Sequence, residues 1–292
     1  MPNVPTTEQQ LLTSYRKISI ATWSHPRDPS TYSWLELPVE EAEAFLKTIK
    51  ADVRPSLTHY VALIVANCLD TYPQLNHVLR GRNLHRRAST DVFITTLLKK
   101  KGSLDLSGFV LKNMTGKGLP ELAAESKRLT EVLKDGTDKG MQQVQQVAMR
   151  VPGWLFGPLM RIQMFFQYTL NLSLEAMGIP DDRFGSVMIS NFGPLGIENA
   201  LVPLSPYCRC PVIMGIGAPK KKAVVIGDEV VVRKCVTISF TFDHRYADGA
   251  HGAVLLHRFE KMFLNPEQYR SIFLPGSVVP ETQAEQPANT AS

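Results

Sequence analysis

The residues with the clearest capacity for chemistry form one run, Asp243-His244-Arg245-Tyr246-Ala247-Asp248-Gly249. Histidine is the side chain that most often takes up and releases a proton near neutral pH, so His244 is a candidate general base. The flanking sequence places it between a strand and a helix, where the backbone would hold the imidazole in position and leave it accessible. The alternative for any single histidine is a structural role, in which the ring only packs and hydrogen-bonds.

Two predicted elements position this run. Residues 235–242 alternate between apolar and polar side chains, which indicates a β-strand with two different faces. The apolar members are Val236, Ile238, Phe240 and Phe242, and the polar members are Thr237, Ser239 and Thr241. A helix is expected from Gly249 to Phe263, and Asp248 is well placed to cap its N-terminus. The small residues of its first turn, Gly249, Ala250, Gly252 and Ala253, allow another backbone or a ligand to approach closely.

The other histidines and the cysteines show no pattern of a metal or redox site. Six further histidines are present, and no pair has HExxH-type spacing: His25, His59, His77, His85, His251 and His257. The four cysteines, Cys68, Cys208, Cys210 and Cys235, are too few for a disulfide framework, and one residue separates Cys208 from Cys210. We therefore expect free thiols, no metal and a reducing, cytoplasmic compartment.

The length and composition fit one globular domain. The chain has 292 residues, of which 44% are hydrophobic and 20% charged. No internal repeat or long linker interrupts it. Residues 1–14 are polar without a clear period, and residues 275–292 are rich in Pro, Ser, Thr, Gln and Ala. The predicted domain therefore spans 15–274, between a flexible N-terminal tail (1–14) and a disordered C-terminal tail (275–292).

The net charge is mildly positive, +5 from 32 basic and 27 acidic residues. The basic residues are scattered, and the densest groups are Lys99 to Lys101 and the set Arg80, Arg82, Arg86 and Arg87. Such a balance does not indicate a nucleic-acid partner, and it fits a substrate that carries phosphate better. Residues 1–15 contain Glu8 and no Lys or Arg, so neither a secretory signal nor a transit peptide is expected.

The order of the predicted elements favours an α+β fold. Strands are expected at 17–23, 31–37 and 91–98, and helices at 39–49, 57–71 and 119–133, the second capped by Ser56. Short β-branched runs follow at 186–190, 212–216, 223–226 and 230–242, with a hairpin turn at Gly227-Asp228. This sequence of elements predicts helices packed on a sheet with antiparallel neighbours.

The stretch 151–177 is unusually apolar. Its residues Leu155, Leu159, Ile162, Phe166 and Leu170 have the spacing of one helical face. We expect a helix of the core or of a subunit interface. The alternatives are a lid over a hydrophobic acyl channel and contact with a membrane surface, although the run is too short to cross a bilayer.

The motif DHRYADG resembles the catalytic signature DHRxxDG of the dihydrolipoamide acyltransferases, the core subunits of 2-oxo acid dehydrogenase complexes, which are related to chloramphenicol acetyltransferase. Five further segments agree in order: Arg16-Lys17, the run 72–76, Ile189-Ser190-Asn191-Phe192-Gly193, the run 213–217 and the run 230–237. The resemblance covers residues 15–270 and implies a chloramphenicol acetyltransferase-like mixed sheet covered by helices, in a homotrimer with active sites between subunits.

The resemblance also implies a mechanism. His244 would remove the proton from a thiol, which attacks an acyl thioester directly without an acyl-enzyme, and Ser190 would stabilise the oxyanion. Asp248 would form a buried salt bridge with Arg16 that holds the loop, and Arg245 would support the site. The substrates would be acyl-CoA or acyl-lipoyl thioesters, with no tightly bound cofactor and no known cofactor-binding residue. From the residues alone, Ser190 is as consistent with a strand-end hydroxyl bonded to backbone, and Asp248 with a helix cap.

Departures from the family pattern widen the range of functions. We expect no lipoyl attachment domain, because nothing like one precedes residue 16, and the chain resembles stand-alone members. The family's Gly-Leu-x-x-Pro segment, which helps line the substrate channel, is replaced by Leu104-Asp105-Leu106-Ser107-Gly108. The acyl group and its acceptor therefore stay open. The alternative to an acyltransferase is a non-catalytic trimeric scaffold derived from the same fold.

Overall fold

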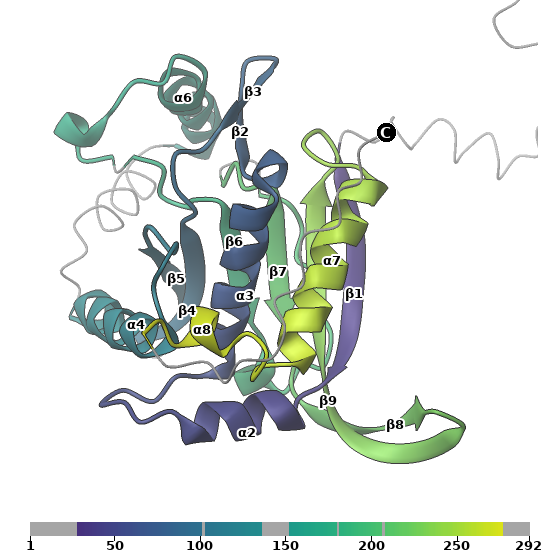
Figure 1. Ribbon diagram of the computed structural model, residues 1–292. Helices are drawn as coiled ribbons and strands as arrows, with labels where there is room; N and C mark the ends of the chain where they lie inside the picture. The colour runs from purple at the N-terminus through teal and green to yellow at the C-terminus, as the bar shows by residue number, and fades with distance from the viewer. Residues whose placement is uncertain (1–27, 101–102, 136–151, 180, 206–207, 277–292) are drawn as a thin grey trace, which may run out of the picture.

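The computed structural model describes residues 28–100, 103–135, 152–179, 181–205 and 208–276 (Figure 1). In this part of the chain, helices pack on one face of a large β-sheet, which confirms the predicted α+β class. The helices of this layer are α2 (Glu40–Thr48), α3 (Leu57–Thr71), α4 (Leu119–Lys134), α7 (Gly249–Leu264) and α8 (Arg270–Phe273).

The sheet is mixed. Its strands lie in the order β1-β9-β7-β6-β4-β5, and β8 pairs with β9. Their bounds are β1 Ser30–Pro38, β4 Val92–Lys100, β5 Ser103–Leu111, β6 Val187–Asn191, β7 Val212–Ile216, β8 Lys220–Ile226 and β9 Glu229–Asp243. The central strands β4, β6 and β7 are parallel, whereas β1, β5 and β8 pair antiparallel with their neighbours. Because β4 and β6 run parallel, Thr95 of β4 and Ser190 of β6 lie side by side just beyond the last pair, Ile94–Ile189.

The alternation along β9 decides what each face of the sheet contacts. Its apolar residues Val236, Ile238, Phe240 and Phe242 are in the core beneath the helices. On the opposite face, the Ser239 hydroxyl donates to the carbonyl O of Ala200 (2.6 Å) and the Thr241 hydroxyl to that of Val202 (2.6 Å). The polar face of β9 therefore binds a loop, as a strand with two different faces requires.

One buried aromatic residue joins α3 to the C-terminal end of α7. Tyr60 is fully buried, and its hydroxyl lies 3.1 Å from the carbonyl O of Met262 and 3.0 Å from that of Phe263. The last carbonyls of a helix have no partner within the helix. Tyr60 supplies a donor there, and burial raises the pKa of its hydroxyl.

Several predicted elements are confirmed within one or two residues. The helix at 57–71 has the predicted bounds and begins after Ser56, and the closing helix runs from Gly249 to Leu264. Gly227 adopts a positive φ of 62° in the turn between β8 and β9, at the predicted hairpin. The predicted strand at 17–23, the predicted tail at 1–14 and all of the predicted tail at 275–292 except residues 275–276 lie outside the described residues.

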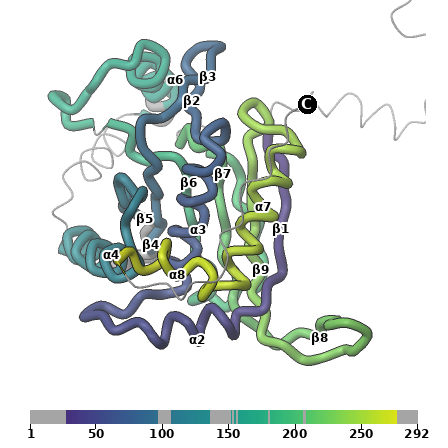
Figure 2. The backbone as a smooth tube through the Cα atoms, viewed as in Figure 1, coloured from purple at the N-terminus to yellow at the C-terminus, as the bar shows by residue number. Residues whose placement is uncertain are grey.

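Two strand regions were not predicted. A small hairpin pairs β2 (His77–Arg80) with β3 (Asn83–Arg86) after the short helix η1 (Pro73–Leu75), and residues 103–111 form β5. The segment 104–108, expected only to replace a channel loop, is therefore part of an edge strand. Figure 2 shows that the hairpin of β8 and β9 extends away from the helices.

The apolar stretch after residue 151 is not in the core of the chain. It forms α6 (Gly153–Met164), the π-helix η2 (Phe165–Thr169) and the short turn η3 (Glu175–Met177). The residues of the predicted apolar face are 41–55% exposed: Leu155, Leu159, Ile162, Phe166 and Leu170. The core alternative is therefore wrong within one chain, while an interface or lid stays a prediction. Among the described residues, no helix is long and apolar enough to cross a membrane.

Candidate active site

Ser190 lies near the end of β6, on the face of the sheet that points away from the helices. Burial alternates along this strand, with Val187 and Ile189 in the helix-side core and Met188 packed in a separate cluster on the other face. Ser190 shares the face of Met188 and is 9% exposed. Its Oγ lies 3.1 Å from Thr95 Oγ1 on β4. The same Thr95 oxygen is 3.2 Å from the carbonyl O of Ile189.

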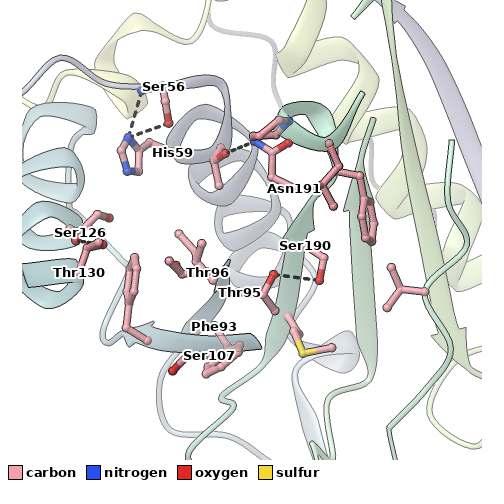
Figure 3. A pocket seen from close by; sticks show the side chains of 18 of the residues that line it. Ser56, His59, Phe93, Thr95, Thr96, Ser107, Ser126, Thr130, Ser190 and Asn191 are labelled. Carbon is pink, nitrogen blue, oxygen red and sulfur yellow. Dashed lines mark hydrogen bonds between the residues drawn. The ribbon is translucent and has the colours of Figure 1, made fainter. Parts of the chain in front are cut away.

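A cavity opens where β4 and β6 separate. The two strands pair only from Val92–Val187 to Ile94–Ile189, and the Thr95–Ser190 contact follows this last pair. The cavity has a volume of about 1100 Å³, and residues from both faces of the sheet line it, including Ser190, Thr95 and Thr96 (Figure 3). This volume is that of a site for a ligand of several hundred daltons.

The chain after Ser190 is held by a side-chain amide. Asn191 Nδ2 donates to the Thr58 hydroxyl on α3 (2.9 Å), and its Oδ1 accepts the backbone N–H of Gly193 (2.8 Å). The short helix η4 (Gly193–Leu195) follows. The loop then crosses the sheet so closely that a Cβ at Gly217 would lie 1.8 Å from the carbonyl O of Glu198. Only glycine fits at that position, so Gly217 lets the loop pack closely on the sheet, and residues 200–203 of this loop line the cavity.

His244 follows the last residue of β9 and is exposed. Its backbone N–H donates to the carbonyl O of Pro29 (2.9 Å), which ties the turn to the start of β1. Asp243, just before it, is 3% exposed and binds the Arg245 guanidinium through both carboxylate oxygens, Nε to Oδ1 at 2.9 Å and Nη2 to Oδ2 at 2.5 Å. The hydrogen bond with Asp243 raises the pKa of Arg245. Arg245 thus stabilises the turn that carries His244.

Tyr246 fixes the other side of this turn. It is 7% exposed, and its hydroxyl accepts the backbone N–H of Leu79 on β2 (3.0 Å). This contact was not predicted, because β2 itself was not predicted.

Asp248 is the N-cap of α7. Its Oδ1 accepts the backbone N–H of His251 (3.1 Å) and lies 2.7 Å from His251 Nδ1. These contacts, the backbone hydrogen bond first, lower the pKa of the carboxyl. The side chain is 57% exposed in the single chain. Arg16, its predicted partner, lies outside the described residues, so the ion pair stays a prediction beside the observed cap.

Ser190 and His244 do not meet within one chain. The strand registers connect Ser190 to Gly215 and then to Ser239, and His244 follows Ser239 by five residues. With about 3.3 Å per residue along a strand and about 4.8 Å between strands, the two Cα atoms are about 19 Å apart. A general base and an oxyanion donor act on neighbouring atoms, each within about 3 Å.

Comparison with known proteins places the chain in a family. Residues 177–270 match the 2-oxoacid dehydrogenases acyltransferase (catalytic domain) family. The dihydrolipoyllysine-residue acetyltransferase component of the pyruvate dehydrogenase complex of Rickettsia conorii is 38% identical over 227 residues, which are 78% of this chain and 44% of that protein. The protein of the same name from Rickettsia felis is 25% identical over 213 residues, 73% of this chain and 41% of the relative.

The chain belongs to the 2-oxoacid dehydrogenase acyltransferase family. It spans less than half the length of these two relatives. The fold agrees with solved structures from the same family. The cubic core of the pyruvate dehydrogenase multienzyme complex has a TM-score of 0.60 at 19% identity, covering 94% of this chain and 100% of that one. The dihydrolipoamide acetyltransferase of Azotobacter vinelandii gives 0.59 at 19% identity with the same coverage.

In this family member, the half of the cavity under α4 contains groups that the sequence did not single out. From the sequence, His59 was assigned to no metal site, yet it lines the cavity together with Ser126. The available signal was its position three residues after the cap Ser56, where a capping box carries a side chain that bonds back to the cap. The backbone N–H of Ser56 donates to His59 Nδ1 (3.0 Å).

The arginine cluster of the sequence divides by role. Arg80, Arg86 and Arg87 line a second cavity of about 500 Å³. The Arg87 side chain is 6% exposed, forms an ion pair with Asp182, and donates to the carbonyl O of Arg209 (3.3 Å). Arg87 therefore stabilises the segment around residue 182. Of the arginines that line this cavity, Arg80 and Arg86 could bind an anion.

The cysteines are poor nucleophiles. All four are free and buried. Burial raises the pKa of Cys68 to about 12, and burial also raises the pKa of Cys210 well above its usual value. A thiol at high pKa supplies little thiolate. Among the residues that the structure describes, no group of three or more His, Cys, Asp or Glu side chains is arranged to hold a metal ion.

Proposed function

We propose that the chain is an acyltransferase that moves an acyl group between a thioester and a thiol, with Ser190 of one copy and His244 of a neighbouring copy in each active site. The observation that carries the proposal is the position of the two side chains. Ser190 faces a cavity of substrate size, and His244 is exposed about 19 Å away along the strand registers. Because Ser190 and His244 lie apart within one chain, a second copy would have to bring the His244 imidazole to Ser190.

The reaction follows from these groups. His244 accepts the proton of the attacking thiol, and the sulfur attacks the thioester carbonyl carbon while the C=O electron pair moves onto oxygen. Ser190 donates a hydrogen bond to that oxyanion. When the C=O bond re-forms, the leaving thiolate departs and takes the proton back from His244. No acyl-enzyme forms, and the buried cysteines take no part.

Thr95 prepares Ser190 for this role. Its hydroxyl is 3.1 Å from Ser190 Oγ and 3.2 Å from the carbonyl O of Ile189, and its single proton can go to either acceptor. When Thr95 donates to Ser190, the proton of Ser190 is left for the oxyanion. A donor aimed in advance at the developing charge costs no reorganisation during the reaction.

The substrates we propose are acyl-CoA and acyl-dihydrolipoamide thioesters, and the assembly we propose is a homotrimer. The relatives from Rickettsia are named as acetyltransferase components of pyruvate dehydrogenase complexes. In the A. vinelandii enzyme, crystallographic and enzymatic work addressed a serine, a histidine and an asparagine in the catalytic mechanism. Ser190, His244 and Asp248 supply a serine, a histidine and a carboxylate here.

Mixing variants tests the shared site. Formation of acyl-dihydrolipoamide from acetyl-CoA and longer acyl-CoA donors is followed by chromatography for Ser190→Ala and His244→Ala, purified separately and co-expressed. Each variant alone is expected to lose about 10²–10⁴ in turnover. Random co-assembly places an intact serine beside an intact histidine in about a quarter of the interfaces, so about a quarter of the activity should return.

His257→Ala is the matched control, because His257 is an exposed histidine of α7 outside the cavity. Its turnover should equal that of the wild type. Wild-type protein that turns over no thioester in this panel contradicts the acyltransferase and favours the scaffold. Active wild type with no recovery on co-expression contradicts the shared site.

A further inference from the structure

One half of the main cavity is lined by polar groups that the proposed mechanism does not use. We call it the α4 arm, and it comprises His59, Thr96, Ser107 and Ser126. Thr96 and Ser107 are cross-strand partners on β4 and β5, on the same face as the core residues Ile94 and Phe109. The α4 arm therefore lies on the helix side of the sheet, whereas Ser190 lies on the other face.

His59 presents a fixed donor to the α4 arm. Because its Nδ1 accepts the backbone N–H of Ser56, the proton of the neutral ring is on Nε2. Burial lowers the pKa of the imidazole to about 4, so the ring stays neutral at physiological pH. In Figure 3 the ring nitrogen away from Ser56 faces the space between α4 and β4. Among the described residues, none accepts a hydrogen bond from it.

Ser126 adds an unpaired hydroxyl. The residue is 5% exposed, and its Oγ is buried without a hydrogen-bond partner in the part of the chain that the structure describes. A buried hydroxyl without a partner costs free energy comparable to a lost hydrogen bond, and native structures contain few. An unpaired group in the wall of a cavity points to a ligand that supplies the missing partner.

The absence of charged groups inside the α4 arm, among the described residues, favours an uncharged ligand. Lys127, Glu131 and Lys134 line the cavity from α4, but all three are exposed. The groups inside the α4 arm are neutral, namely one imidazole and three hydroxyls, and Ile94 and Phe109 add apolar walls. A carboxylate there would lose its water without gaining an opposite charge, whereas an uncharged oxygen would gain two donors.

We propose that the α4 arm binds an acyl chain carrying an uncharged oxygen, a hydroxyl or keto group, that hydrogen-bonds to His59 Nε2 and Ser126 Oγ. The proposal rests on the proposed function, since it places the thioester carbonyl of the same chain at Ser190. A cavity of about 1100 Å³ far exceeds the needs of an acetyl group and has room for a functionalised chain.

The test measures binding first and turnover second, on the full chain. The probes are hexanoyl-CoA and its hydroxyhexanoyl counterparts with the hydroxyl on successive carbons, titrated by calorimetry. Wild type should bind at least one hydroxyacyl thioester about tenfold more tightly than hexanoyl-CoA, as expected for two hydrogen bonds of ordinary strength. The affinity for hexanoyl-CoA is the internal reference for every variant.

The variants separate the hydrogen bonds from folding. Ser126→Ala removes a hydroxyl that has no described partner, so it should fold normally and lose most of the preference. His59→Leu should lose the preference, whereas His59→Gln should retain part of it, because a glutamine side chain can both accept from Ser56 and donate to the ligand. His257→Gln, on the exposed face of α7, should bind like wild type.

Equal binding of all the probes by wild type overturns the inference, and so does a preference that survives Ser126→Ala and His59→Leu together. A preference in binding without turnover of any probe supports the α4 arm and contradicts the proposed function alone. Turnover of hexanoyl-CoA without a binding preference for any hydroxyacyl thioester supports the proposed function and contradicts the α4 arm.

Discussion

The neutral state of His59 predicts a specific pH dependence of stability. Burial lowers the pKa of the folded imidazole from the usual 6.5 to about 4. Between these two values the unfolded chain binds a proton at this residue and the folded chain does not. The free energy of unfolding therefore falls as the pH is lowered through the unfolded pKa, and the loss is complete below the folded pKa.

The size of this loss follows from the shift. A difference of about 2.5 pKa units corresponds to about 3 kcal/mol when fully developed, and about 2 kcal/mol of it should be lost by pH 5. Asp and Glu side chains ordinarily have pKa values of about 4, so the pH dependence of wild type alone does not isolate the histidine. His59→Gln carries no titrating group but can keep the bond to Ser56, and the difference between the two proteins isolates His59.

Urea unfolding at fixed protein concentration, repeated from pH 7 to pH 4, measures that difference. Wild type should lose about 2 kcal/mol more than His59→Gln between pH 7 and pH 5. His257 is exposed, so the free energy of unfolding of His257→Gln should change with pH as that of wild type does. A constant difference between wild type and His59→Gln across this range would refute the neutral, desolvated imidazole, and with it the fixed Nε2 donor.

Three further predictions concern the site and the assembly. Ser190→Ala should lower kcat/KM about 10²–10³-fold without lowering the melting temperature, and Thr95→Val should lower it by a smaller factor; equal kcat/KM for both variants and wild type contradicts the oxyanion role. Asp248→Ala should lower the free energy of unfolding through loss of the cap. A double-mutant cycle with Arg16→Ala then measures the predicted ion pair, and a coupling near zero in urea unfolding excludes it. Light scattering at micromolar concentration should give the mass of a trimer, and the mass of a monomer would contradict an active site shared between subunits.

The local elements were predictable where one signal dominated. Helix α3 has a cap at Ser56 and ends before Pro73, so its bounds follow from local backbone chemistry. The alternation along residues 235–242 correctly assigned opposite faces of β9, because the period of a strand does not depend on what covers it. Strand β2 has four residues, too few to show a clear alternation. Strand β5 was missed although residues 103–107 alternate between polar and apolar side chains, because this segment was interpreted as the replacement of a channel loop.

The stretch after residue 151 shows the limit of periodicity. The spacing from Leu155 to Leu170 correctly indicated an apolar helical face, but that face is exposed in the single chain. The spacing of apolar residues shows that one face of a helix is apolar. It does not show whether that face packs in the core of the chain or against another subunit. The choice between core and interface therefore needed the structure.

The sequence by itself determined the motif of residues 243–249, the family and the order of the elements, because these depend on residue types and short spacings. Tertiary structure alone decided the rest of the site. It placed Ser190 and His244 about 19 Å apart, since they are on strands of different direction and register. It also brought His59 and Ser126, 67 residues apart in the chain, to one cavity wall. Such contacts depend on the packing of helices on the sheet, and no local pattern in the sequence records them.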